Sequence, residues 1–416
     1  MTRLKHLLMV LAILVPAFAS AQAEVPDYSR LTAEHHPRLF LDNQEFEAMK
    51  SLIGSGTPSY LSDLHDIIME ICRLDAMKDS PLEYKLDASD KRILHVSRDA
   101  LTRIFFCAYA YRYTGEQIYL EHAEKTIRTV CGFKDWNAGK HFLDTGEMAA
   151  AVAIGYDWLY DALDEDTKRM AEKAFVDFAV NPARKKKGGA RFYRMTNNWN
   201  QVCNAGIVCG CLAMYETFPE RARELIGISV ESNRKAMNEM YPPDGNYPEG
   251  PGYWGYGSTF EALMLSALES CVGTDFGLSE TKGFRDTGRY VVYSYGTTGR
   301  FYNYSDCGEY GTPSIALWYF ADRFNSPDVL YNELRLMRQG SYLNLGQESR
   351  LLPLMAAFAM NIPHGGVKAP KGVYSGNGVT PVVMFHTDWT FSESDVYLGV
   401  MGGGAGAPPS HMDAGS

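Results

Sequence analysis

The sequence predicts a mainly α-helical protein in which helical hairpins are followed by the start of a β-domain. From Asp42 to about Phe324, apolar residues recur at steps of three and four positions, which is the period of a helix with one buried face. After about Pro363, glycine, proline and asparagine turn signals separate short β-branched runs, as is typical of strands. These two patterns divide the mature chain into a helical domain over 24–362 and a β-domain that begins in 363–416.

The helical domain is predicted to contain pairs of neighbouring helices. In each pair a long apolar stretch is followed, across a short polar turn, by a more amphipathic one. Ser97 and Asp99 are the predicted N-caps of the first pair, whose first helix ends near Gly115. Because no strict sequence repeat is visible, we expect a closed or incomplete barrel of helix pairs with the apolar helices inside. The pairs are 97–116 with 116–133, 145–163 with 164–180, and 199–218 with 219–240.

Two segments near the C-terminal end are predicted strands. They are "VTPVVMFH" (379–386) and "DVYLGVMGG" (395–403), in which β-branched residues lie between turn signals. A β-domain this short buries a sheet poorly, because a lone hairpin is only marginally stable. We therefore expect the sequence to stop inside the β-domain.

The first residues predict export. Arg3 and Lys5 precede the apolar run 7–15, and alanine occupies every second position from 17 to 23. The apolar run is shorter than the roughly 20 residues that a membrane span needs. Residues 1–23 are therefore expected to be a cleaved signal peptide, and the mature protein to be secreted or periplasmic and not an integral membrane protein.

The net charge and the spacing of the cysteines argue against a nucleic-acid-binding protein, a disulfide-rich protein and a structural zinc site. The formal net charge of −10 argues against a partner nucleic acid, whose binding surface would be basic. Eight cysteines lie singly on apolar stretches, which predicts buried small hydrophobes and not a disulfide framework. None of them has the CxxC spacing of a structural zinc site.

Polar and aromatic residues gather in three predicted loops at helix ends, where core packing does not require them. The loop 191–201 sets Asn197, Asn198 and Asn200 around Trp199, an arrangement that can hold a sugar by amide hydrogen bonds and ring stacking. The alternative is that Asn197 or Asn198 caps the following helix.

The second and third loops, 241–257 and 300–313, add aromatic and acidic residues. The second is rich in proline and glycine and is expected to precede a helix that begins near Ser258. For Asp306 in the third loop, the alternative is again helix capping. Loops of this composition in an exported protein point to carbohydrate as the ligand.

Five stretches together carry a family resemblance: "HHPRLF", "KHFLDTGEMAAAVAIGYDWLYDAL", "NNWNQVCNAG", "DGNYPEGPGYWGYG" and "HMDAGS". In this order they resemble the heparinase II/III-like polysaccharide lyase superfamily, which includes heparin and alginate lyases. The likeness covers nearly the whole mature chain. It implies an incomplete (α/α) toroid of helical hairpins followed by an antiparallel β-sandwich, with the cleft between them.

The resemblance also implies cleavage of uronic-acid polysaccharides by β-elimination. A hydrogen-bonding side chain neutralises the uronate carboxylate, a tyrosine or histidine takes the proton from carbon 5, and a tyrosine protonates the leaving glycosidic oxygen. Matched motif to motif, the neutralising amide falls on Asn198, with Asn200 as the second candidate. The catalytic tyrosine falls on Tyr253, with Tyr256 as the alternative. The implied substrate-binding residues are Arg194, Trp199, Asn200, Glu249, Trp254, Tyr256 and Tyr304.

This chain departs from the family pattern at two positions, and both concern the residue that takes the proton from carbon 5. Several relatives have a histidine directly after the asparagine, where this chain has Trp199. Many carry an H-x-H-x-D pattern, in which the first histidine is catalytic and the second binds zinc. Aligned to it, "PPSHMDAGS" places His411 at the second histidine and Pro409 at the first. His411 is therefore the implied ligand of one zinc ion whose other ligands lie outside this chain, and Tyr253 alone would take the proton where its pKa is lowered.

The hypothesis is an exported polysaccharide lyase whose partner is an anionic polysaccharide or oligosaccharide, such as a glycosaminoglycan or an alginate-like glycan. Two alternatives stay open. One is a catalytically inactive glycan-binding protein on the same toroid. The other is a glycoside hydrolase, which needs two opposed carboxylates. Its loop candidates are Asp244, Glu249, Asp306 and Glu309.

Overall fold

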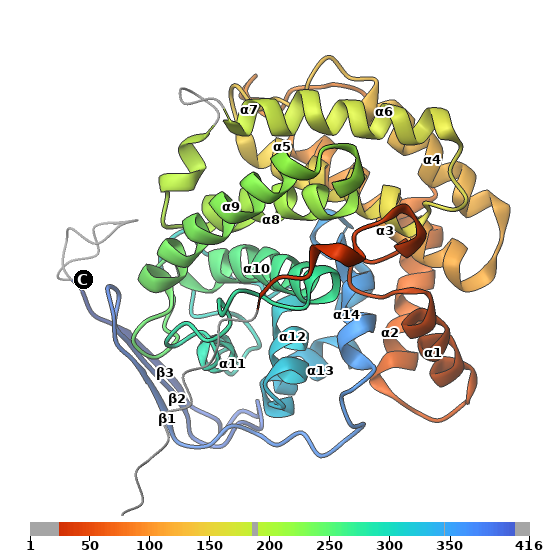
Figure 1. Ribbon diagram of the computed structural model, residues 1–416. Coiled ribbons are helices and arrows are strands. Elements are labelled where there is room, and N and C mark those ends of the chain that lie inside the picture. The colour runs from red at the N-terminus through yellow and green to blue at the C-terminus, as the bar shows by residue number, and fades with distance from the viewer. Residues whose placement is uncertain (1–24, 185–189, 345, 404–416) are drawn as a thin grey trace, which may run out of the picture.

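The computed structural model describes residues 25–184, 190–344 and 346–403, which form a mainly helical chain with one small sheet. Figure 1 shows the helices wrapped around a common centre, with the sheet at the periphery beside α11. The predicted fold class, a toroid of helical hairpins followed by the start of a β-domain, is confirmed.

Six helices form an inner layer. Each packs on the next in chain order, and the last returns to α2 (Tyr60–Ile71) and to the first, so that the layer curls into a ring. The six helices are α3 (Leu94–Thr114), α5 (Phe142–Trp158), α8 (Asn198–Ala213), α10 (Gly250–Val272), α12 (Ile315–Arg323) and α14 (Leu352–Ala359).

Further helices cover this layer or connect its members. The second helix packs on the first in all three predicted pairs, since α4 lies against α3, α6 against α5 and α9 against α8, and α6 also contacts α4. These contacts confirm the helical hairpins. The remaining helices are α1 (Asn43–Gly54), α4 (Gln117–Cys131), α6 (Glu165–Phe175), α7 (Asn181–Arg184), α9 (Pro219–Met240), α11 (Thr287–Ser294) and α13 (Tyr331–Arg338).

The contact between α5 and α8 is unusually close. Every residue of α5 is buried, and Gly206 of α8 lies against Gly146 of α5. A Cβ at Gly206 would come within 2.0 Å of the Gly146 carbonyl oxygen, so this crossing requires glycine. The close approach fixes the start of α8 relative to the start of α5.

Two helices begin earlier than the sequence predicted. Helix α3 begins at Leu94, so Ser97 does not cap it, and the Ser97 hydroxyl instead donates to the Asp144 carbonyl at 2.8 Å. Helix α10 begins at Gly250, eight residues before the predicted start at Ser258. Its Pro251 is compatible with a first helical turn, where the missing N–H has no helical partner to lose. Three of the aromatic residues expected on a loop, Tyr253, Trp254 and Tyr256, therefore lie on a helix.

The sheet has three antiparallel strands in the order β1 (Val373–Gly376), β2 (Val382–His386) and β3 (Tyr397–Met401). The last two confirm the predicted strands, and the first was not predicted. Tyr374, Val382 and Met384 are buried toward the helical domain, and β1 and β2 both contact α11. The sheet is thus attached to the helices through one face.

Burial agrees with the expected role of the cysteines, because seven of the eight are buried and all eight are free thiols. Within the described ranges, no helix combines the length and apolarity that crossing a bilayer requires. The predicted signal peptide, 1–23, lies outside the described residues and stays a prediction.

Candidate active site

The N-terminal ends of α5, α8 and α10 lie together at one end of the helical domain. The Asn198 backbone N–H donates to Glu249 Oε2 at 3.3 Å, which joins the start of α8 to the start of α10. The Trp199 ring meets the His141 ring edge-on, with centroids 4.7 Å apart, and so joins α8 to the residue that precedes α5. Three inner helices therefore bring their first residues to one place.

Asn198 is the first residue of α8 and its side chain is available to a ligand. The capping role belongs to Asn197, whose side chain accepts the Trp199 N–H at 3.2 Å. Within the described chain, the Asn198 amide group forms no hydrogen bond, although the residue is only 4% exposed. The Asn198 amide is not among the buried polar groups that lack a partner, so its atoms are open to solvent and can bind a polar group that enters from outside.

Tyr253 lies on the first turn of α10 and is partly exposed. Burial raises the pKa of its phenol, Asp306 and Glu249 raise it further, and Arg92 opposes them. The phenol therefore keeps its proton at neutral pH. This differs from the sequence-based expectation of a lowered pKa and suits Tyr253 to donate a proton more than to remove one.

Glu249 ends the loop before α10 and is 8% exposed. Burial raises the pKa of its carboxyl to about 7, with a smaller increase from Asp306, while the Asn198 N–H lowers it. Glu249 thus changes charge near neutral pH beside both Asn198 and Tyr253. Perturbed carboxyls of this kind are frequent in active sites.

His141 precedes α5 and was not selected from the sequence. Its Nδ1 lies 2.5 Å from Asp144 Oδ1. The other oxygen of Asp144 accepts the Ile93 N–H and the Asn137 amide, both at 2.7 Å. A histidine whose ring is oriented by a buried carboxylate is a frequent element of catalytic sites. The signal in the sequence was the H-x-x-D spacing at the start of a helix.

These contacts close into a ring that we call the rim cluster. Arg92 is near enough to Tyr253 to influence its pKa, and the next residue along the chain, Ile93, is bonded to the carboxylate that holds His141. The rim cluster consists of Arg92, His141, Asn198, Trp199, Glu249 and Tyr253. It combines proton-transferring groups with an amide and an aromatic ring.

Cations surround the rim cluster on an otherwise acidic protein. Lys91, Arg92, Lys140 and Arg194 are exposed, and none of them forms an ion pair with another residue of the described chain. Lys140 directly precedes His141, and Arg194 ends the turn before α8. This edge of the molecule can therefore attract an anion.

Tyr256 connects the rim to a buried ion-pair network. Its hydroxyl donates to Glu147 Oε1 at 2.7 Å, and Glu147 also binds Arg350 at 2.6 Å and Arg98 at 3.1 Å. Burial alone would raise the pKa of Glu147, but Arg350 and Arg98 lower it below its ordinary value. In this structure the proton of the Tyr256 hydroxyl is thus used in the hydrogen bond to Glu147.

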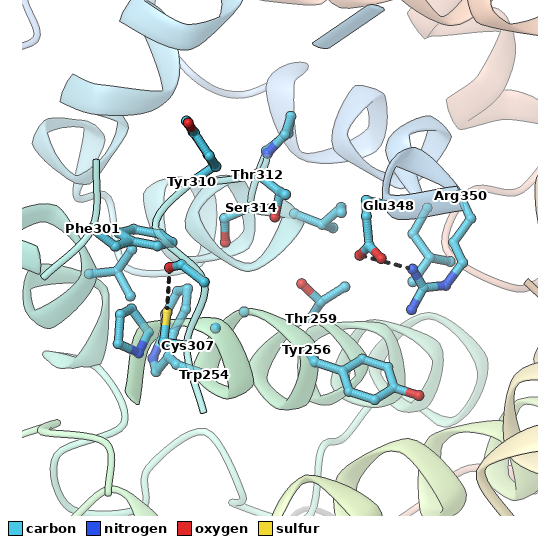
Figure 2. A pocket seen from close by; sticks show the side chains of 18 residues that line it. Trp254, Tyr256, Thr259, Phe301, Cys307, Tyr310, Thr312, Ser314, Glu348 and Arg350 are labelled. Atoms are coloured by element: carbon cyan, nitrogen blue, oxygen red, sulfur yellow. Dashed lines mark hydrogen bonds and ion pairs between the residues drawn. The ribbon is translucent and has the colours of Figure 1, made fainter. Parts of the chain in front are cut away.

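A pocket of about 210 Å³ lies between the first turns of α10 and the segments 301–315 and 348–351. Figure 2 shows Tyr256, Glu348 and Arg350 at one end of it, and Phe301, Cys307 and Tyr310 at the other. Tyr310 is 71% exposed and lies under the Arg300 guanidinium. The pocket offers an aromatic surface and polar groups beside the first turns of α10.

Three predicted substrate-binding residues lie inside the protein. Trp254 is fully buried and its indole N–H donates to Thr287 Oγ1 at 2.8 Å. Asn200 is also fully buried, and its amide donates to the Phe192 carbonyl and the Ser232 hydroxyl. The Tyr304 hydroxyl lies 2.5 Å from that of Tyr290. Asn200 and Tyr304 are enclosed by protein partners, so we do not retain them as ligand contacts, whereas Trp254 lines the pocket beside α10 and stays a prediction.

The predicted zinc ligand, His411, lies outside the described residues, as does Pro409. Across 25–184, 190–344 and 346–403, no group of three or more histidine, cysteine, aspartate or glutamate side chains is arranged to hold a metal ion. Zinc binding through His411 therefore stays a prediction.

Comparison with known proteins gives matches only among solved structures, since no family model and no curated protein matches the chain. An alginate lyase from Bacteroides ovatus superimposes with a TM-score of 0.50 at 12% identity, over 77% of this chain and 99% of that one. A chondroitin AC lyase from Streptomyces coelicolor A3, in complex with chondroitin sulphate, gives a TM-score of 0.48 at 12% identity, over 82% of this chain and 53% of that one. A xanthan lyase from Paenibacillus gives 0.43 at 12% identity, over 82% and 37%.

The alginate lyase is a polysaccharide lyase of the α/α-toroid type. At this level of identity the likeness concerns the fold. The chain therefore has the fold of the α/α-toroid polysaccharide lyases.

Proposed function

We propose that the protein is an exported polysaccharide lyase that cleaves a uronic-acid-containing glycan by β-elimination. The observation that carries the proposal is the rim cluster, where the Asn198 amide and the Tyr253 phenol lie on the first turns of α8 and α10, which Glu249 joins, beside exposed cations. The toroid fold shared with an alginate lyase supports the reaction class.

The reaction needs three things that the rim cluster can supply. An amide must hydrogen-bond the uronate carboxylate, so that the charge which develops after loss of the carbon-5 proton is stabilised, and Asn198 is placed for this. A base must take that proton. An acid must protonate the leaving glycosidic oxygen, and a tyrosine with a raised pKa, such as Tyr253, holds the proton to do so.

The exposed cations around the rim cluster indicate that the substrate is negatively charged. The exposed cations Lys91, Arg92, Lys140 and Arg194 favour a polyanion, and Trp199 offers a partly exposed ring against which a sugar can stack. We therefore place the scissile uronate at the rim cluster, with the chain extending toward the pocket beside α10.

The direct experiment uses the purified protein and a panel of heparin, heparan sulfate, hyaluronan, chondroitin sulfate, alginate and ulvan. Elimination creates a carbon–carbon double bond next to the carboxylate, so absorbance in the ultraviolet rises as bonds are cleaved. We expect this increase with at least one member of the panel. New reducing ends without absorbance would contradict elimination, and binding without either signal would indicate a glycan-binding protein.

A second candidate function is glycoside hydrolysis, which one observation favours. Glu249 has a carboxyl pKa raised to about 7 and lies within electrostatic reach of Asp306, so two carboxyl groups are present near each other. The other predicted carboxylates are engaged elsewhere, because Glu309 pairs with Arg300 at 2.7 Å and Asp244 binds Asn377. Loss of all activity in Asp306→Asn, with Tyr253→Phe still active, would support hydrolysis.

A further inference from the structure

His141 and Asp144 form an oriented pair outside the residues that the sequence pointed to. Asp144 is fully buried and its Oδ2 already accepts two hydrogen bonds, from the Ile93 N–H and the Asn137 amide. Oδ1 is left to accept the Nδ1 proton of His141 at 2.5 Å. This arrangement fixes the ring and leaves Nε2 with its lone pair.

The Nε2 side of His141 belongs to the rim cluster. The ring meets Trp199 edge-on, and Trp199 directly follows Asn198. Within the described residues, Nε2 forms no hydrogen bond, and the side chain is not completely enclosed, with 7% of its surface exposed. A group bound against Asn198 and Trp199 would therefore lie beside the His141 ring.

The proposed reaction still lacks a base. Tyr253 retains its proton because burial and two neighbouring carboxylates oppose its ionisation. Tyr256 donates to Glu147 and is held between Arg98 and Arg350. Neither tyrosine is therefore suited to remove a proton at neutral pH.

We propose that His141 is a catalytic residue that removes the carbon-5 proton and that Asp144 is its positioning residue, an assignment that rests on the function proposed above. The carbon–hydrogen bond breaks and its proton goes to His141 Nε2. The electron pair forms the double bond between carbons 4 and 5, and the bond from carbon 4 to the glycosidic oxygen breaks. That oxygen takes the Tyr253 proton, and solvent then restores both residues.

Several charged groups lie with His141 in the rim cluster or next to it in the chain. Asp144 lies on the same helix, Arg92 precedes α3, and Glu249 and Tyr253 come from α10. Lys140 is its neighbour in the chain. Since burial raises the pKa of the Glu249 carboxyl to about 7, its effect on the pH dependence of activity is separated by repeating the measurements in a Glu249→Gln background.

The test compares His141→Gln and His141→Ala with wild type on a substrate that wild type eliminates. We expect kcat to fall by about 10²- to 10⁴-fold with a small change in KM, as for loss of a general base. The acidic limb of the kcat/KM profile should disappear, and added imidazole should restore part of the activity of His141→Ala. The matched control is His65→Gln. His65, on α2, is also buried, and its Nδ1 lies 2.9 Å from the hydroxyl of Tyr109 on α3.

The outcomes separate the two proposals. No elimination product from wild type on any uronate would overturn the proposed function and this role with it. Elimination by wild type, together with unchanged kcat and pH profile in His141→Gln, would overturn only the role of His141. Loss of activity accompanied by a lowered Tm and without imidazole rescue would also overturn it, because a structural role predicts that pattern. Asp144→Asn should move the acidic limb while leaving the carbohydrate affinity unchanged.

Discussion

The rim cluster and a set of fully buried polar residues on α8, α9 and α10 differ in their hydrogen bonding. Asn200, Gln201, Asn204, Asn233 and Glu261 form what we call the core amide network, and all five are fully buried. Gln201 and Asn233 both donate to Glu261 Oε2, at 3.2 and 2.8 Å. In the rim cluster, Asn198 keeps a side-chain amide without a partner among the described residues.

The contrast shows that one motif can serve two purposes. "NNWNQVCNAG" contributes Asn197 as a cap, Asn198 to the rim, and Asn200, Gln201 and Asn204 to the core. Hydrogen bonds between these buried groups join α8, α9 and α10, although Asn204 Oδ1, Asn233 Oδ1 and Glu261 Oε1 have no hydrogen-bond partner among the described residues. The core amide network thereby positions the helix ends that carry the rim cluster. The groups of the rim cluster itself are left free to bind a substrate. Substitutions in the two regions should therefore affect different quantities.

The largest expected effect is on catalysis at Tyr253. Tyr253→Phe removes the proposed acid and should lower kcat by about 10²- to 10⁴-fold, with Tm close to wild type because the side chain is partly exposed. The matched change is Tyr247→Phe, which removes a buried hydroxyl that donates to Gln201 Oε1 at 3.0 Å. It should lower the free energy of unfolding by about 1–3 kcal/mol and leave kcat nearly unchanged. Kinetics and urea unfolding of both variants decide whether the two regions are separable.

The paired asparagines test the same division with a smaller effect. Asn198→Ala should lower kcat by about 10²- to 10³-fold, as for loss of one donor to a developing charge, and should change stability little. Asn200→Ala should instead destabilise the fold by about 1–3 kcal/mol, because the Ser232 hydroxyl and the Asn204 amide lose a partner. If both variants lost stability equally and neither lost kcat, the assignment of Asn198 to the rim would be wrong.

The smallest expected effect is the pH dependence of stability. Glu249 and Glu261 both have a carboxyl pKa raised to about 7 in the folded state from an ordinary value of 4.5, mainly through burial. Between these two values the folded state keeps a proton that the unfolded state releases, so each carboxyl lowers stability as the pH rises from 4.5 to 7. Glu249→Gln and Glu261→Gln should each flatten this decline by on the order of 2 kcal/mol.

Activity distinguishes the two glutamates. Only Glu249 adjoins Asn198 and Tyr253, so only Glu249→Gln should alter the pH profile of kcat/KM. Measured profiles that change equally in both variants would show that the core amide network and the rim cluster are not independent.

The sequence predicted the helical pairs and two of the three strands because these depend on local periodicity. It could not separate Asn198 from Asn200, since both lie in one asparagine-rich stretch and only the orientation of α8 decides which is enclosed. Trp254 was misjudged because α10 begins at Gly250, which turns its indole toward Thr287. His141 was missed because its importance comes from contacts with Asp144 and with Trp199, which is distant in the sequence.

The central claim is that bonds are broken at the rim cluster by elimination and not by hydrolysis. In the most direct measurement, a uronate polysaccharide that the protein cleaves is digested in water labelled with oxygen-18. The masses of the products are then determined by mass spectrometry. Elimination adds no water, so the account predicts unsaturated ends and no label incorporated by cleavage, with product formation lost in Tyr253→Phe. Saturated products that carry the label at the new reducing end would contradict it.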